Sequence, residues 1–527
     1  MASSLSEAVP KFTAEALRSA AKFSEGCHVV PVRLRRAIKK YLREEEDPHM
    51  NRKVLSLSKS LSQIKEVNLT LPISTSKELV EDPLKSTESS KRWKITSAYG
   101  DIGLTYRDDE SIAYVASRMP AVFSACYRVL TEVRRRVPDF SPVKVLDFGA
   151  GTGAAMWALR EVWPQSVEKI NLIEPSQSMQ RAGLRLIQDQ KNLPFIQSYG
   201  SLQALTQKIN KSERKHDLVI ASYVLGEIPS LKDRITIVRQ LWDLTGDVLV
   251  ILEPGTPEGS NIISHIRSHI LWMENRKFRK AEAAAHKGST SLVTAKSGAF
   301  IVAPCPHDGR CPLNKTGKYC HFIQRLQRTT SQRAYKRSKG KPLRGYEDEK
   351  FCYVAFRRGQ RPRQVLYLVT FQLKPHVFGL TCTILREPWP LDDMKFDTLK
   401  EQKAKRSPED LETDYDDQSV SDTDEDEQEK NLVSHNPEFT ETEAISDSDA
   451  NAEVQEEEKP AADLGSGWGR IIYSPIRRGK RVELDVCRST NRDGSEGSFD
   501  RIIITQSKNP TLHLQARRSL WGDLWPF

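Results

Sequence analysis

The chain has 527 residues, a length that predicts two or three domains rather than one core. Hydrophobic residues make up 38% of it, and no apolar run approaches the roughly 20 residues that a membrane-spanning helix requires. The composition argues against a membrane protein, so we expect soluble globular domains interrupted by polar segments. Eight cysteines in a chain of this length, with no clear secretory signal, do not indicate a disulfide framework.

The net charge of +10 conceals a strong asymmetry. Between Glu409 and Glu458 the chain carries 21 acidic residues and one basic residue, Lys430. The other 79 basic and 49 acidic residues leave a net charge of +30. Such a surplus is typical of proteins that bind a polyanion. Residues 394–464 are too polar to form a core, so we predict an acidic disordered insertion there.

The first 28 residues are rich in serine and alanine, and their basic residues could lie along one amphipathic helix. Mitochondrial transit peptides are built in this way. Glu7 and Glu15 weaken the match, so an ordinary disordered leader is the alternative.

Residues 29–140 are predicted to be a helical region. Val30–Leu42 has the pattern of a basic amphipathic helix. In Asp109–Val137 apolar residues recur at spacings of three and four, and Pro120 is expected to kink or divide this helix. We interpret the second helix as core packed before the first strand and assign it no other role.

Strands and helices alternate in residues 141–300. The expected strands are Val143–Phe148, Ile170–Ile173, Asp217–Ser222 and Asp247–Leu252. The segments between them, such as Met179–Asp189 and Lys232–Leu244, have helical periodicity. This order predicts a Rossmann-type α/β domain with a parallel sheet, whose ligands bind at the carboxyl ends of the strands.

The first strand runs into a glycine turn, Gly149-x-Gly151-x-Gly153, and then into a helix. Glycine allows positive φ and close approach of a ligand, and the helix start presents free N–H groups. Asp147 at the strand end and Glu174, 27 residues later, are placed to accept hydrogen bonds. A simple structural turn is the alternative, but the second acidic strand end favours a cofactor pocket.

This loop resembles motif I of the class I S-adenosylmethionine methyltransferases and differs in spacing from the dinucleotide-binding G-x-G-x-x-G. The resemblance implies that the glycine loop holds the methionyl part of the cofactor and that Glu174 holds its ribose. The candidate cofactor-binding residues are Asp147, Gly149, Gly151, Gly153 and Glu174.

The segment His216–Glu227 occupies the fourth-strand position, where methyltransferases gather substrate contacts. It has neither the Asn/Asp-Pro-Pro-Tyr/Phe motif for methylating an exocyclic amine nor a Pro-Cys nucleophile. Tyr223 and Glu227 are the nearest candidates, and we interpret both as positioning or packing residues. The sequence therefore identifies no catalytic residue.

Three cysteines, Cys305, Cys311 and Cys320, lie within 16 residues in a loop rich in proline and glycine. Clustered thiolates suit a soft metal, either zinc or an iron–sulfur cluster, and the spacing does not choose between them. Unliganded thiols are the alternative. A fourth ligand has to come from elsewhere, and the candidates are His307, His321, Cys352, Cys382 and Cys487.

The segment Gln324–Arg344 has eight basic residues and no acidic one. We predict that it contacts the phosphate backbone of structured RNA, although such a run is often only a solvated face. The candidate RNA-binding residues are Arg325, Arg328, Arg333, Lys336, Arg337 and Lys339.

A small β-rich C-terminal domain is expected in residues 351–393 and 465–527, on either side of the acidic insertion. Its predicted strands are Phe351–Phe356, Gln364–Phe371, Leu380–Leu385, Arg481–Cys487 and Phe499–Thr505.

Taken together, these motifs resemble the mitochondrial small-ribosomal-subunit methyltransferase-like family. The resemblance rests on the glycine loop, Leu252–Pro257, the Cys-Pro-His-Asp-Gly-x-Cys-Pro loop, Tyr346–Phe351 and Ser519–Leu524, in this order. It implies a [4Fe–4S] cluster in residues 301–350 with Cys305, Cys311 and Cys320 as ligands. The family's fourth cysteine follows a basic turn in the C-terminal β region. Cys487 fits that description, whereas Cys352 is interpreted as core.

The family resemblance implies a factor of the mitochondrial matrix that binds small-subunit rRNA and its proteins and acts in subunit assembly or translation. S-adenosylmethionine and the cluster would then be structural or sensing ligands. One alternative is an active S-adenosylmethionine-dependent rRNA methyltransferase. A second is a zinc-binding protein methyltransferase outside mitochondria.

Overall fold

The computed structural model describes part of the chain. The described residues are 21–23, 26–45, 49–50, 52–54, 57, 106–228, 230–286, 298–314, 316–335, 345–361, 469–491, 494–508 and 510–525. The candidate transit peptide up to residue 20, the strands expected at Gln364–Phe371 and Leu380–Leu385, Cys382 and the acidic insertion lie outside them. None of the described helices combines the length and apolar character that crossing a bilayer requires.

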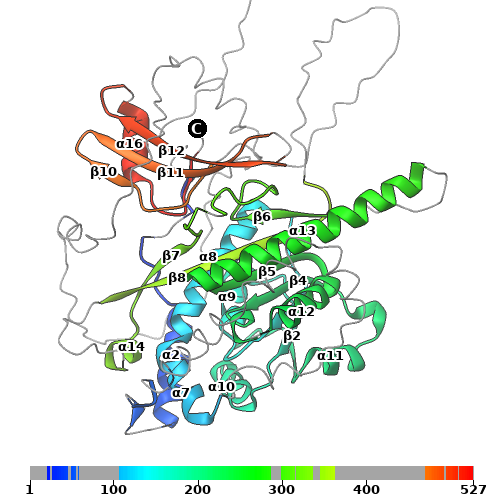
Figure 1. Ribbon diagram of the computed structural model, residues 1–527. Helices are drawn as coiled ribbons and strands as arrows, with labels where there is room; N and C mark the ends of the chain where they lie inside the picture. The colour runs from blue at the N-terminus through cyan, green and yellow to red at the C-terminus, as the bar shows by residue number, and fades with distance from the viewer. Residues whose placement is uncertain are drawn as a thin grey trace, which may run out of the picture.

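The larger of two sheets has the order β3-β2-β1-β4-β5-β8-β6, and β7 also pairs with β8 (Figure 1). Its strands are β1 (Lys144–Phe148), β2 (Lys169–Ile173), β3 (Phe195–Tyr199), β4 (His216–Ser222), β5 (Thr245–Pro254), β6 (Ala299–Ala303), β7 (Phe322–Gln327) and β8 (Tyr346–Arg358). The first five are parallel, and β8 runs antiparallel to β5, β6 and β7. The strand order reverses between β1 and β4, which opens a crevice at their carboxyl ends.

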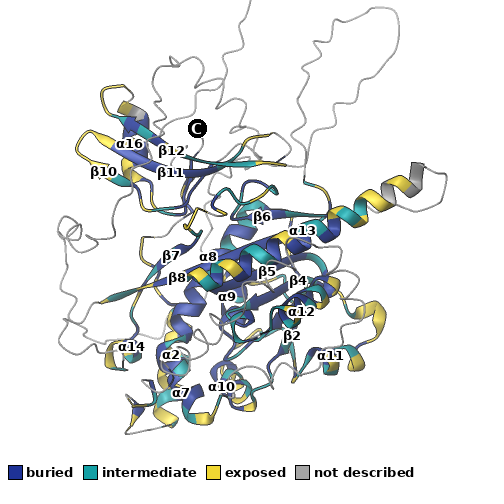
Figure 2. Cartoon of the chain, viewed as in Figure 1, coloured by how far each residue is buried: buried dark blue, intermediate teal, exposed yellow. Residues whose placement is uncertain are grey.

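Helices cover both faces of this sheet because successive strand residues point to opposite sides. On β1, Val145 packs with one set of helices and Leu146 with the other. The first set is α2 (Val32–Glu44), α7 (Asp108–Ser117), α8 (Met119–Arg136), α9 (Ala154–Val162) and α10 (Gln177–Ile187). The second set is α11 (Leu202–Lys208), α12 (Leu231–Leu244) and α13 (Pro257–His286). Figure 2 shows both buried layers.

The four predicted strands and the alternating helices are confirmed to within a few residues. The sequence prediction missed β3, an edge strand in which only Tyr199 is buried and which therefore has no buried apolar run. The predicted helix Asp109–Val137 is divided at Arg118, because Pro120 lies in the first turn of α8. The N-terminal amphipathic helix is confirmed as α2, which buries Leu34 and Ile38.

One domain assignment is corrected by the strand pairing. The sequence analysis placed Phe351–Phe356 in the C-terminal domain, but this segment is part of β8 and pairs with β5 and β6 in the larger sheet. All of its residues are buried, as expected for a strand covered on both faces. An apolar run of this kind predicts a central strand but does not indicate which strands it pairs with.

The smaller sheet has the order β10-β11-β9-β13, with β12 also paired to β11. Its strands are β9 (Gly469–Ile471), β10 (Ile476–Arg478), β11 (Arg481–Ser489), β12 (Gly497–Thr505) and β13 (Leu524–Trp525). The helix α16 (Pro510–Arg518) packs on β11 and β12 and closes a separate apolar core. These strands lie in the part of the chain, after residue 465, where the sequence analysis expected β structure.

A buried polar contact joins the two sheets. Arg470 of β9 pairs with Glu132 of α8, and both side chains are at most 2% exposed. Arg136 pairs with the same carboxylate at 2.9 Å, and the Tyr353 hydroxyl donates to it at 2.7 Å. Burial alone would raise the pKa of Glu132, but the two guanidinium groups outweigh it and hold the pKa at about 2. The carboxylate is therefore ionised at neutral pH. The Arg470 guanidinium also donates to the Gly522 carbonyl at 2.6 Å.

We predict that Glu132→Leu lowers the free energy of unfolding by about 3–5 kcal/mol, because it leaves two guanidinium groups buried without their carboxylate. Urea denaturation followed by circular dichroism measures this loss. Asp108→Asn, which removes the exposed partner of Arg181, is the control and should change stability little. Equal stability of the two variants would contradict the role given to Glu132.

Candidate functional site

A cavity of about 520 Å³ lies at the carboxyl ends of the parallel strands, where the strand order reverses. Its walls come from the glycine loop, the ends of β2, β4 and β5, the start of α13, and β8. The volume falls within the range of about 300–1,000 Å³ that is usual for small-molecule sites. The position is the one at which open parallel sheets bind ligands.

The three glycines of the loop all have positive φ, of 72° at Gly149, 54° at Gly151 and 83° at Gly153. A Cβ on Gly149 would lie 2.5 Å from the Val224 side chain, so that position needs glycine for packing as well as for φ. At Gly151 a Cβ would meet nothing within 4 Å, and this residue lines the cavity. Gly153 caps the amino end of α9 and does not line the cavity.

Glu174, two positions before the N-cap of α10, joins β2 to the glycine loop. Its Oε2 accepts from the Gly151 amide at 2.8 Å, and its Oε1 accepts from the Ser176 amide at 2.9 Å. Burial raises the pKa of this carboxyl to about 6, against the opposing effect of these two hydrogen bonds. A carboxylate has about four acceptor sites, so Glu174 can still accept from a ligand hydroxyl in the cavity.

Asp147 is fully buried at the end of β1 beneath the glycine loop. Neither of its carboxyl oxygens has a hydrogen-bond partner among the described residues. Burial, and to a smaller extent the charge of Glu174, raises its pKa to about 7. A buried polar group without a partner is costly, and such groups cluster at functional sites. Asp147 does not line the cavity itself, so it acts on the cavity through the loop above it.

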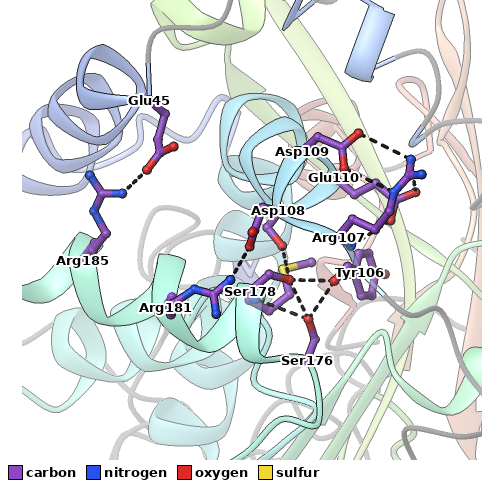
Figure 3. A network of polar contacts seen from close by, with 12 residues as sticks. Glu45, Tyr106, Arg107, Asp108, Asp109, Glu110, Ser176, Ser178, Arg181 and Arg185 are labelled. Carbon is purple, nitrogen blue, oxygen red and sulfur yellow. Dashed lines mark hydrogen bonds and ion pairs between the residues drawn. The ribbon is translucent and has the colours of Figure 1, made fainter.

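Tyr106 closes one side of the cavity and was not predicted from the sequence. Its hydroxyl donates to Glu227 at 2.8 Å. Figure 3 shows the hydroxyls of Ser176 and Ser178 beside Tyr106, and they donate to its carbonyl at 3.2 and 2.7 Å. The start of α10 therefore positions Tyr106 from the same turn that carries Glu174.

A second unpredicted wall is built around Glu349 of β8. The Arg118 guanidinium donates to both of its oxygens, at 2.5 and 2.7 Å, and the Tyr223 hydroxyl donates at 2.9 Å. Arg118 lies between α7 and α8, so the helix interpreted as core alone also supplies a cavity residue. Apolar periodicity could not reveal this, because Arg118 is the residue at which the periodic helix breaks.

Tyr223 follows β4 with a φ of 58°, an uncommon conformation for an aromatic residue. Its amide donates to the Leu252 carbonyl at 2.8 Å, and the Arg118 guanidinium lies 5.1 Å from its ring centre. Such local strain, which costs on the order of 1–3 kcal/mol, is found most often at functional sites. Burial and the nearby Glu349 raise the pKa of this phenol well above its usual value, so it stays protonated.

Glu253 at the end of β5 is a third buried carboxyl at the cavity. It accepts from the amides of Leu225 and Gly226 at 2.9 and 3.1 Å. Burial raises its pKa to about 7, which the two amides and Arg234 partly oppose. Glu253 thus fixes the turn after β4 that carries Tyr223 and Glu227.

The predicted cysteine ligands are brought together from two domains. Cys305, Cys311 and Cys320 line one cavity of about 360 Å³ between α13 and β8. Cys487 of β11 forms a small buried cluster with Leu313 and Ile472, and Cys311 and Cys320 pack against this cluster. Burial first, and then the neighbouring thiols, raises the pKa of both Cys320 and Cys487. Within the described ranges, however, no three His, Cys, Asp or Glu side chains already stand as metal ligands.

The other candidates for a fourth ligand have different surroundings. Cys352 is buried in β8, as the interpretation as core expects, although it also borders the cysteine cavity. The Nε2 of His307 lies 3.4 Å from the Cys487 Sγ. His321 stacks against Tyr319.

The described part of the basic segment is already paired in part. Arg325 donates to Asp348 at 2.8 and 2.9 Å, and Arg328 lies 3.6 Å from Glu347, both on the neighbouring strand β8. Arg333 lies on the short helix α14 (Thr330–Tyr335) and is exposed. Lys336, Arg337 and Lys339 lie outside the described residues. Asp348 and Glu347 follow the basic segment in the chain, so the charge pattern of that segment alone could not predict that they pair with it.

Comparison with known proteins finds one matching family, described as mitochondrial small ribosomal subunit Rsm22, over residues 108–378 and 424–526. The human ribosome assembly protein METTL17, mitochondrial, is 30% identical over 256 residues, which are 47% of this chain and 52% of that protein. The ribosome assembly protein RSM22, mitochondrial, of Saccharomyces cerevisiae is 23% identical over 480 residues, 78% of this chain and 66% of that protein. The Schizosaccharomyces pombe Rsm22-cox11 tandem protein 2, mitochondrial, is 24% identical over 464 residues, 85% of this chain and 48% of that protein. The chain therefore spans only about half to two thirds of these relatives.

Solved structures are more distant. A putative RNA methyltransferase from Pyrococcus horikoshii has 12% identity and a TM-score of 0.24, covering 45% of this chain and 85% of its own. The magnesium protoporphyrin IX methyltransferase of Synechocystis has 14% identity and a TM-score of 0.21, covering 37% and 86%. At these scores neither structure supports an inference about ligand or reaction.

We predict that Asp147→Asn stabilises the protein at pH 8 in the absence of ligand, by up to about 4 kcal/mol. The folded-state pKa of about 7 lies above the usual 3.8. Between about pH 4 and 7 the folded chain therefore retains a proton that the unfolded chain has lost, and above pH 7 the folded chain carries the full cost of a buried charge. Wild-type stability should then fall as pH rises from about 4 to 7, and the gain of Asp147→Asn should vanish below pH 4. Urea denaturation across this range measures both chains, with the exposed Asp243→Asn as the control for loss of a surface charge. A gain independent of pH would contradict the assignment.

Proposed function

The chain belongs to the mitochondrial small ribosomal subunit Rsm22 family, and from this premise we propose that it is a ribosome assembly factor that binds S-adenosylmethionine and small-subunit rRNA. The mitochondrial localisation expected from the sequence agrees with the family and with the relatives named above. The proposal places the protein in the matrix, with small-subunit proteins and rRNA as its partners. The observation that carries it is the cavity at the point where the strand order reverses, whose wall includes the positive-φ glycine loop and Glu174, which accepts from that loop.

The residues around this cavity fit S-adenosylmethionine. Gly151 leaves the loop open to the cavity, and Glu174 retains acceptor capacity for the two ribose hydroxyls. Tyr106 and Met179 supply apolar and aromatic surface at the same wall. The buried, unpartnered carboxyl of Asp147 sits directly under the loop and favours a positively charged group nearby. S-adenosylmethionine when bound supplies an activated methyl group next to a sulfonium.

Binding is better supported than catalysis because the polar groups at the cavity already have partners. Tyr223 is held by Glu349, Glu227 accepts from Tyr106, and Glu253 accepts from two amides. A general base has to lie within hydrogen-bond reach of the substrate proton, whereas these groups are engaged in holding the walls of the cavity. An active rRNA methyltransferase is the second candidate, because Asp147 and all three glycines of the loop are present.

The cysteine cluster is proposed to hold a [4Fe–4S] cluster through Cys305, Cys311, Cys320 and Cys487, with zinc as the alternative. Sulfur donors of this number suit either. The loop that carries Cys305 and Cys311 is held by polar contacts to both domains. The Arg267 guanidinium donates to the Gly309 carbonyl at 2.6 Å, and the Asp308 amide donates to the Gly494 carbonyl at 2.7 Å. Metal binding across this junction would couple the two domains.

The RNA contact is proposed to lie on the basic segment with Arg325, Arg328, Arg333, Lys336, Arg337 and Lys339. Because Arg325 and Arg328 already face carboxylates of β8, RNA phosphates would compete with Asp348 and Glu347 for them. Such contacts provide affinity and register without sequence specificity.

We expect wild-type protein to bind S-adenosylmethionine in isothermal titration calorimetry and Glu174→Gln to bind about 10- to 100-fold more weakly. This loss corresponds to about 1.5–3 kcal/mol for a hydrogen bond to a charged acceptor. The exposed Glu168→Gln is the matched control and should keep the wild-type affinity. No binding by wild-type protein would overturn the cofactor proposal.

Mapping rRNA methylation in cells that carry Asp147→Ala with Gly151→Arg then separates an assembly factor from an active rRNA methyltransferase. Normal assembly with one lost methyl mark would favour the enzyme.

Anaerobically purified protein should contain iron and absorb broadly in the visible range, and Cys487→Ser should lose both signals. Cys27→Ser removes an exposed thiol and is the control that should keep them. A colourless protein with bound zinc would defeat the iron–sulfur assignment. Iron retained in Cys487→Ser would defeat the choice of the fourth ligand alone.

A further inference from the structure

A second large cavity, of about 830 Å³, lies between α2 and the carboxyl ends of α9 and α10. Each of these helices follows a parallel strand and runs back towards the amino ends of the strands. The cavity therefore lies near the amino ends of the strands, whereas the cofactor pocket lies at their carboxyl ends. We call it the basic cleft. Its cationic lining residues are Arg33, Arg36, Lys40, Arg160, Arg185 and Lys191.

The carboxylates around the basic cleft neutralise only some of these cations. Lys40 pairs with Asp189 at 2.5 Å, and Arg185 pairs with Glu44 at 2.8 Å. Arg185 also pairs with Glu45, and Figure 3 shows this second contact. Within the described part of the chain, Arg33, Arg36 and Lys191 have no carboxylate at ion-pair distance. One side of the cleft is therefore paired and the other carries uncompensated positive charge.

On the uncompensated side, two guanidinium groups from different helices come close together. Burial lowers the pKa of Arg160, and the charge of Arg33 lowers it further. Arg160 is held in place, because it donates to the Lys191 carbonyl at 2.9 Å and lies 5.9 Å from the Trp157 ring centre. The exposed Glu161 interacts electrostatically with both guanidinium groups. Two guanidinium groups that line one cavity favour an anion in it.

The helix α2 cannot use its amphipathic pattern to bind a membrane. A basic amphipathic helix binds a bilayer by inserting its apolar face. In α2 that face, with Leu34, Ile38 and Tyr41, is already buried against the larger domain. What remains exposed is a row of positive side chains at residues 33, 36 and 40, which spans about 10 Å along the helix. This row is long enough to meet more than one phosphate of a nucleic acid strand.

We propose that the basic cleft binds the phosphate backbone of structured RNA, as a second contact separate from the basic segment of residues 324–344. The proposal rests on the rRNA-binding function proposed above and names a new surface for it. Arg33, Arg36 and Arg160 provide planar guanidinium groups, which pair with phosphate through two parallel hydrogen bonds. Contacts of this kind position a duplex and carry no sequence readout.

The test is RNA binding by the full chain, measured by fluorescence anisotropy with a synthetic RNA hairpin over a range of salt concentrations. In the triple variant Arg33→Gln, Arg36→Gln, Arg160→Gln, the slope of log affinity against log salt should fall by about 2 to 3. The control is a second triple variant, Lys208→Gln, Lys211→Gln, Lys215→Gln, which removes three exposed cations elsewhere on the surface. It should leave the slope near that of wild type.

A second measurement does not depend on the variants. Phenylglyoxal modifies accessible arginines, and RNA should protect Arg33 and Arg36 from it in wild-type protein, as read by mass spectrometry. Equal slopes for the two triple variants, or no protection of Arg33 and Arg36 while RNA is bound, would overturn the proposal that the basic cleft binds RNA. Either result would leave the proposed rRNA-binding function unaffected. No RNA binding by wild-type protein would overturn that function and the cleft together.

Discussion

The buried contact between Glu132 and Arg470 sets the relation between the two domains. Arg470 on β9 pairs in register with Cys487 on β11, so the position of Cys487 follows directly from where Arg470 is held. The carboxylate that holds it lies on α8, which also packs against β8 and α9 of the larger sheet. Because a buried guanidinium without its carboxylate is costly, the β domain has one favourable way to dock. That docking brings Cys487 to Cys311 and Cys320.

The cofactor pocket depends on three carboxyl groups that are buried at the carboxyl ends of β1, β2 and β5. Glu174 and Glu253 are satisfied by backbone amides of the loops that they fix, whereas Asp147 has no partner among the described residues. Burial raises the pKa of all three. Burying these groups lowers the stability of the ligand-free protein at neutral pH. A cationic or hydrogen-bonding ligand in the pocket would raise that stability. This supports a binding role whether or not a methyl group is transferred.

The two proposed RNA contacts differ in how their charges are balanced. On β7, Arg325 and Arg328 face carboxylates of β8, so RNA has to displace existing partners there. In the basic cleft, Arg33 and Arg36 have no carboxylate at ion-pair distance within the described chain, and Arg160 repels Arg33. The cleft should therefore contribute more to the dependence of binding on salt. The net charge of +30 outside the acidic segment is consistent with either site, since composition does not locate charge in space.

The sequence by itself determined the order of strands and helices, the glycine loop, the two acidic strand ends and the cysteine loop. Each is a short-range pattern: alternating apolar runs, glycines where φ must be positive, and thiols close along the chain. Only the tertiary structure decided that β8 inserts beside β5, that Arg118 and Glu349 form a wall of the pocket, and that Arg470 lies against Glu132. These pairs are separated by between 97 and 338 residues. Arg118 and Arg470 each face a carboxylate because a buried charge needs an opposite charge. The strand β8 lies beside β5 because its apolar residues have to be covered on both faces. Neither requirement leaves a local pattern that names the partner.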